Sequence, residues 1–217
     1  MAMHCPQCGA DLPAAGSSPL DLCPRCLLSA ALNADPDSCP YHIVAPIAES
    51  RTGTTYLAQP MPGRDVVALK IFGERDDADE VLARFARLKP AFARVNHPGV
   101  APLLDVGLTD EGLLYLAARF VPGWQLGAID DHKSVGHDSR VEIARQLTAA
   151  IAAIHEAGLA HLAIDASKVR VSTAGGIRAT LLGFGVRMIV EGAEPSRGQD
   201  CGALAKLLGG IGVEAIP

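Results

Sequence analysis

The hydrophobic pattern from residue 41 onward predicts three strands in succession, followed by a helix. The strands are expected over residues 41–49, 53–59 and 66–72, with short turns between them, so neighbouring strands should pair antiparallel. From Asp79 the apolar spacing changes to that of an amphipathic helix. The predicted apolar stripe consists of Val81, Phe85, Leu88, Phe92 and Val95.

Two further strands and a second long helix follow. The strands are predicted over residues 100–106 and 113–121. A helix should begin at Ser139, with Glu142 completing a capping box, and end near Gly158. The order of three strands, a helix, two strands and a helix predicts an α+β fold. The buried face of the second helix is expected to hold Ile143, Leu147, Ile151 and Ile154.

Two CxxC pairs precede this pattern. Cys5 and Cys8 are followed, after fourteen residues, by Cys23 and Cys26, a spacing typical of a zinc site. Four thiolates bind one Zn²⁺ tetrahedrally and leave no open position, so the metal should be structural. The alternative is a pair of disulfides or unrelated thiols, which a reducing cytoplasm disfavours. We therefore predict a small zinc ribbon at residues 1–33.

Composition and charge exclude several classes of protein. The chain has 217 residues, of which 49% are hydrophobic, enough for one ordinary domain at residues 41–217 behind a small appendage and a linker at residues 34–40. It contains no uninterrupted apolar run of about 18 residues and no secretory signal, so we expect no membrane span and a cytoplasmic location. The net charge is -5, and Arg25 is the one basic residue among the first forty, which disfavours nucleic acid as a partner.

Five short motifs occur along residues 41–217 in a recognisable order. They are Ala48–Tyr56 around Gly53, Val67–Lys70, Asn96–Val100, His161–Ala163 and Gly183–Gly185. This order resembles the protein kinase fold, specifically the eukaryotic-like Ser/Thr kinases of bacteria. The resemblance implies a five-stranded antiparallel N-lobe sheet with helix αC and a partial helical C-lobe.

The same resemblance points to lost catalysis. Phosphoryl transfer needs a carboxylate that accepts the hydroxyl proton, ligands for Mg²⁺ and an ion-paired strand lysine. Ala163 stands in place of the catalytic-loop aspartate, Lys168 in place of the metal-binding asparagine, and Gly183 in place of the DFG aspartate. None of these side chains can do the corresponding task, so the chain resembles a pseudokinase and gives little support to ATP with Mg²⁺ as cofactors.

Two candidate nucleotide-binding residues remain, the strand lysine Lys70 and Gly53, the glycine left in the Gly-rich loop. Leu88 falls at the αC glutamate position, where the resemblance would place the acidic partner of the strand lysine. Pro90 follows and should kink that helix.

The hydrophobic framework of the kinase fold is better kept. The resemblance places Phe92, His161 and Phe184 in a stacked internal column, and Asp200 at the helix αF aspartate that supports the catalytic loop. The sequence stops soon after that helix, so we expect a lobe truncated near αF whose exposed apolar surface is covered by a protein partner or by self-association.

Three hypotheses about function follow. The first is a catalytically inactive scaffold or regulatory interaction module with a structural zinc site. The second is an ATP-binding enzyme of the Ser/Thr kinase family with atypical residual activity. The third is a nucleic-acid-binding zinc ribbon protein, which the acidic N-terminal segment disfavours.

Overall fold

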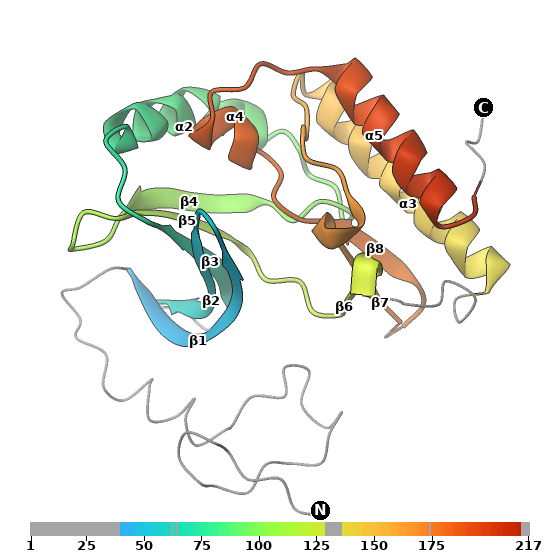
Figure 1. The fold of residues 1–217 in the computed structure, drawn as a ribbon, viewed down its shortest axis with the longest axis horizontal. Coiled ribbons are helices and arrows are strands. Elements are labelled where there is room, and N and C mark those ends of the chain that lie inside the picture. The colour runs from blue at the N-terminus through green and yellow to red at the C-terminus, as the bar shows by residue number, and fades with distance from the viewer. Residues whose placement is uncertain (1–39, 62, 64, 129–135, 174, 214–217) are drawn as a thin grey trace, which may run out of the picture. The chain divides into compact units, whose positions relative to one another are not determined.

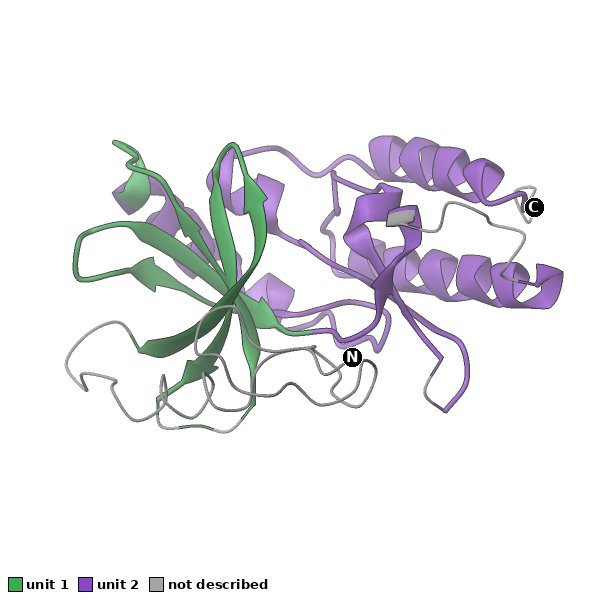
Figure 2. Cartoon of the chain, turned by 60° about the horizontal axis from the view of Figure 1, so that its bottom comes forward, with its two compact units in different colours: residues 1–78, 104–120 green, residues 79–103, 121–217 purple. Residues whose placement is uncertain are grey.

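The computed structural model describes residues 40–61, 63, 65–128, 136–173 and 175–213. The chain divides into two compact units, coloured green and purple in Figure 2. Unit 1 comprises residues 1–78 and 104–120, and unit 2 comprises residues 79–103 and 121–217. The helix predicted from Asp79 therefore belongs to unit 2, with the helical part of the chain.

Unit 1 is built on the predicted five-stranded sheet, with strand order β1-β2-β3-β5-β4 (Figure 1). The β1–β2, β2–β3 and β3–β5 pairs are antiparallel. A core cluster on β2, β3 and β5 includes Ala58, Leu69 and Tyr115. The strands are β1 (Tyr41–Ser50), β2 (Gly53–Pro60), β3 (Val67–Phe72), β4 (Leu103–Leu108) and β5 (Leu114–Arg119).

The strand predicted over residues 100–106 is shorter than expected. Val100 forms an isolated parallel bridge with Leu181, and β4 begins only at Leu103. The amide of Ala101 donates to the carbonyl of Leu181, and Pro102 comes next. Because proline has no amide hydrogen, it cannot continue a ladder of backbone bonds, and the two pairings are separate.

Unit 2 contains four helices and a three-stranded sheet of order β6-β7-β8 among its described residues. Figure 1 shows α3 and α5 running side by side, and α3 also packs against β8. The helices are α2 (Ala78–Phe92), α3 (His137–Glu156), α4 (Val186–Val190) and α5 (Arg197–Gly210), and the short 3-10 turns are η1 (Leu126–Ala128) and η3 (Ala166–Lys168). The strands are β6 (Trp124–Gln125), β7 (Val169–Ser172) and β8 (Arg178–Leu181).

The predicted start of α3 was wrong by two residues. The helix begins at His137, and its N-cap, Gly136, makes no side-chain capping bond. Glu142 therefore lies inside the helix, where it forms a two-bonded ion pair with Arg145 instead of a capping box. The buried face is the predicted one, and the helix ends at Glu156, close to the predicted end.

The other long helix, α2, also follows its predicted stripe. Val81, Phe85 and Phe92 are buried, and Leu88 is half-buried. Pro90 lies in the last turn, and the helix continues past it to Phe92. No helix among the described residues is both long and apolar enough to cross a membrane.

Candidate functional site

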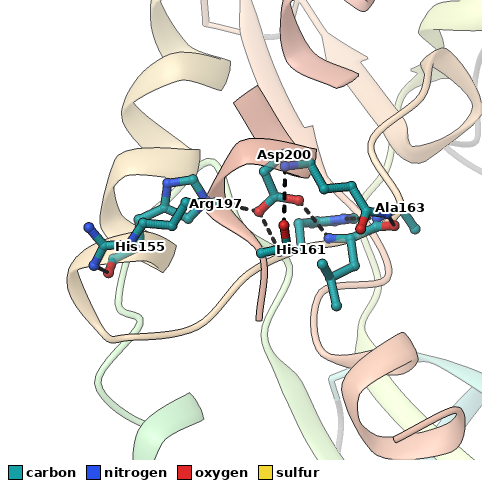
Figure 3. A network of polar contacts seen from close by, with 8 residues as sticks. His155, His161, Ala163, Arg197 and Asp200 are labelled. Atoms are coloured by element: carbon teal, nitrogen blue, oxygen red, sulfur yellow. Dashed lines mark hydrogen bonds and ion pairs between the residues drawn. The ribbon is translucent and has the colours of Figure 1, made fainter. Parts of the chain in front are cut away.

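A fully buried carboxylate, Asp200 on α5, holds the backbone of residues 161–168, the catalytic-like loop (Figure 3). Oδ2 of Asp200 accepts the amide hydrogen of His161 at 2.7 Å, and Oδ1 accepts that of Leu162 at 2.7 Å. Nε2 of His155, on α3, lies 2.9 Å from Oδ2. Hydrogen bonds to an ionised acceptor are stronger than neutral ones, and burial makes their loss costly. Asp200 therefore has the loop-supporting position predicted for it.

These bonds hold an unfavourable backbone conformation. Leu162 has φ +66°, the one non-glycine residue with positive φ among those described. This region costs an ordinary L-residue about 1–2 kcal/mol. The carbonyl oxygen of Leu162 accepts hydrogen bonds from Arg187 at 2.9 Å and Gln199 at 3.3 Å, so both sides of its peptide are fixed. Side-chain hydrogen bonds from three residues therefore stabilise the backbone conformation of this loop.

His161 is a core histidine, as expected from the sequence. It is fully buried, and desolvation lowers its pKa, although the negative charge of Asp200 opposes that shift. Nε2 lies 3.1 Å from the carbonyl oxygen of Leu182, while Nδ1 lies 3.4 Å from the amide nitrogen of Ala163. A neutral ring with hydrogen on Nε2 satisfies both contacts.

The predicted internal column is present in unit 2. The rings of His161 and Phe184 have centroids 6.5 Å apart, and Phe184 meets Phe92 edge to face at 5.3 Å. Gly185 has φ +84°, and a β-carbon there would lie 3.0 Å from the Phe92 ring. The glycine that ends the GFG motif is therefore needed for packing.

Two of the three residues expected at catalytic positions, Lys168 and Gly183, lie close together. Lys168 ends η3, and its Cδ lies 3.9 Å from the place of a β-carbon on Gly183. No hydrogen bond or ion pair engages the Lys168 ammonium among the described residues. Ala163 lies half-buried in the same loop. The side chains of Lys168, Ala163 and Gly183 are thus an ammonium, a methyl group and a hydrogen atom.

The carboxylate of the catalytic-like loop, Asp165, is engaged in capping η3. Oδ1 of Asp165 accepts the amide hydrogen of Ser167 at 2.6 Å and caps η3. In the part of the chain that the structure describes, no group of three or more His, Cys, Asp and Glu side chains could hold a metal ion. The arrangement therefore offers an ordered loop without a proton acceptor at Ala163.

The two nucleotide-binding candidates lie in unit 1 and are engaged within it. Nζ of Lys70 donates to Oγ1 of Thr52 at 2.7 Å and lies 4.7 Å from the ring centre of Phe72. Gly53 has φ +139°, and a β-carbon there would clash with the carbonyl oxygen of Ile71 on the neighbouring strand. Gly53 therefore has a structural reason to be glycine that does not involve a phosphate.

Sequence reasoning missed two arginines that fix α4. Nη1 of Arg84, on α2, donates to the carbonyl oxygen of Ile189 at 2.7 Å, while its Nη2 pairs with Glu80 at 2.9 Å. Arg187 pairs with Glu191 within the segment and also bonds to the catalytic-like loop. The Glu80–Arg84 spacing is visible in the sequence, but a backbone carbonyl partner is not. The segment after the GFG motif is therefore a fixed helix.

The predicted zinc ligands Cys5, Cys8, Cys23 and Cys26 lie outside the described residues.

Comparison with known proteins agrees with this geometry, although no family model matches the chain. It is 31% identical over 133 residues to the Ser/Thr-protein kinase pkn3 of Myxococcus xanthus, which covers 60% of this chain and 24% of that protein. The probable Ser/Thr-protein kinase PknB of Lactococcus lactis is 27% identical over 147 residues, covering 66% of this chain and 23% of that protein. The chain thus spans about a quarter of the length of these curated relatives.

Solved structures show the same fold. The kinase domain of Mycobacterium tuberculosis PknI superposes with a TM-score of 0.63 at 23% identity, over 83% of this chain and 77% of that domain. A double mutant of that domain gives a TM-score of 0.62 at 26% identity, over 83% and 76%. The chain therefore has a protein-kinase-like fold, and its homologues are bacterial Ser/Thr protein kinases.

Proposed function

We propose that this chain is a pseudokinase, a catalytically inactive kinase-like scaffold that acts by presenting surfaces to another protein. One observation carries the proposal. Asp200 and the ring column of unit 2 hold the catalytic-like loop in an ordered conformation, yet Ala163, Lys168 and Gly183 stand at its reactive positions. The chain retains the contacts that maintain the loop and lacks the side chains that would use it.

The chemistry of phosphoryl transfer explains why these replacements matter. Catalysis depends on positioning and on neutralising the developing charge with Mg²⁺. Gly183 offers no metal ligand, and the Lys168 ammonium beside it repels a divalent cation. Ala163 cannot take the proton of a hydroxyl substrate. The contact of Lys70 with Thr52 also supports the proposal, since it engages the strand lysine within unit 1.

The proposal predicts that ATP with Mg²⁺ does not stabilise the protein. A ligand that binds the folded state raises its stability by RT ln(1 + [L]/Kd), about 2.7 kcal/mol at one hundred times Kd. We expect the melting temperature in a thermal-shift titration to stay constant up to millimolar ATP, with or without Mg²⁺ or Mn²⁺. The Ser/Thr-protein kinase pkn3 of Myxococcus xanthus serves as the comparison protein. A saturable, metal-dependent rise would refute the scaffold and favour an ATP-binding enzyme.

We also propose that Cys5, Cys8, Cys23 and Cys26 bind one structural Zn²⁺ and that the protein works in the cytoplasm, where these thiols stay reduced. Elemental analysis of purified protein should find one zinc per chain. Replacing Cys8 with serine should abolish stoichiometric zinc, because a structural site needs all four ligands. The matched control is Cys201→Ser, since Cys201 is an exposed free thiol on α5. Equal zinc loss in both variants, or disulfides in the purified protein, would contradict the site.

A further inference from the structure

One side of α5 consists almost entirely of small exposed residues. Asp200, Leu204, Leu207 and Leu208 face the core of unit 2. Gly198, Gly202, Ala205 and Gly209 recur at spacings of four, three and four residues, which places them on one stripe of the helix, and all four are exposed.

Packing among the residues that the structure describes does not account for these glycines. A β-carbon at Gly198, Gly202 or Gly209 would meet nothing within 4 Å, and none of the three has positive φ. Glycine in an exposed helix interior destabilises it by about 0.5–1 kcal/mol relative to alanine. Alanine would therefore fit and strengthen α5. Small residues on a helix face instead allow a second backbone to approach closely.

An open groove adjoins this stripe, with a volume of about 690 Å³. Gly202, Ala203 and Leu207 of α5 form part of its apolar lining. It also carries one charge of each sign, Asp165 from the loop before η3 and Lys206 from α5, and both side chains are exposed. No ion pair engages either of them among the described residues.

Opposite charges on one patch make that patch complementary to itself. In a two-fold dimer each contact occurs twice, so Lys206 of one copy can meet Asp165 of the other, and the reverse. Complementary charges of this kind fix the register of an interface, while the apolar lining supplies the buried surface. A partner whose charges are all of one sign would leave either Asp165 or Lys206 without an opposite charge. The charge pattern therefore favours a second copy of this chain over an unrelated helix.

We propose that the α5 stripe and its groove form the interface of a two-fold homodimer, with α5 of each copy lying along α5 of the other. The inference rests on the proposed scaffold function and names the second copy as a partner. Small residues let the two helix backbones pack closely, and two Lys206–Asp165 pairs flank the contact.

Sedimentation of the full chain over a range of concentrations tests this interface. We expect a reversible dimer. Gly202→Leu should weaken it by at least tenfold in Kd, because a large side chain separates the helices while the space around Gly202 lets α5 fold. The control is Ala86→Leu, which adds the same apolar side chain to an exposed position on α2. Far-UV circular dichroism and melting temperature establish that each variant is folded.

Charge reversal gives the sharper test. Lys206→Asp and Asp165→Lys should each weaken the dimer about tenfold or more, and the double variant should return Kd to within about threefold of the original. A monomer at every concentration would overturn the proposal, as would a dimer that none of these substitutions affects. The thermal-shift titration is independent of this result. An ATP-binding dimer would refute the scaffold and leave the interface standing.

Discussion

Replacing Asp200 with alanine should cost unit 2 about 4 kcal/mol or more of its free energy of unfolding. The substitution removes a buried acceptor from the amides of His161 and Leu162 and from the ring of His155. Each buried donor left without a partner costs about 1–3 kcal/mol. Leu162 then loses a bond that holds its positive φ. Since whole domains are stable by about 5–15 kcal/mol, a large part of unit 2's stability is at stake.

The measurement can be confined to unit 2. Trp124 is the single tryptophan of the chain and lies on β6, so its fluorescence during urea denaturation reports on that unit. Asp200→Asn, which keeps one oxygen acceptor, should lose less stability than Asp200→Ala. Glu194→Gln alters an exposed carboxylate and should leave the urea midpoint nearly unchanged. A midpoint for Asp200→Ala close to that of Glu194→Gln would show that the loop is held by other contacts.

Gly53→Ala should destabilise unit 1 by about 2–4 kcal/mol in the absence of any nucleotide. A β-carbon would clash with the carbonyl oxygen of Ile71, so β2 and β3 must separate where they pair. The backbone at φ +139° adds conformational strain for any residue with a side chain. If the glycine were kept only for contact with a phosphate, the unliganded protein would lose little stability.

The tyrosines provide a signal specific to unit 1. All three, Tyr41, Tyr56 and Tyr115, lie on its strands, so their near-UV circular dichroism follows the sheet during denaturation. Gly112→Ala is the matched control, because Gly112 also has positive φ, +77°, but a β-carbon there meets nothing within 4 Å. We expect it to cost about 1 kcal/mol. Equal losses in the two variants would mean that backbone strain, and not the clash with Ile71, decides the effect.

Periodicity predicted the elements well where the local sequence decides them. The stripe of α2 and the buried face of α3 follow from apolar spacing, because each helix has one side to bury. The start of α3 was not predicted correctly. Glu142 was expected to cap the helix with Ser139, but it pairs with Arg145, which is also only three residues away. The break before β4 was visible as Pro102, but the bridge of Val100 to Leu181 joins residues far apart in sequence.

The candidate site was predictable only through its resemblance to a family. Motif order located His161, Gly183 and Asp200, and the structure places all three in unit 2. Contacts between side chains and backbone atoms could not be predicted from motifs in the sequence. The bond from Arg84 to the carbonyl of Ile189 and the positive φ of Leu162 depend on tertiary packing, which no side-chain pattern encodes.

The short segment that contains α4 also limits how this protein could be controlled. Between Gly183 and Asp200 the chain has one hydroxyl side chain, Ser196, and its Oγ accepts the amide hydrogen of Gln199 as the N-cap of α5. Two arginines tie the rest of the segment to α2 and to the loop. A phosphate on Ser196 would replace the hydroxyl that caps α5, so a covalent change at this segment would act on the start of that helix.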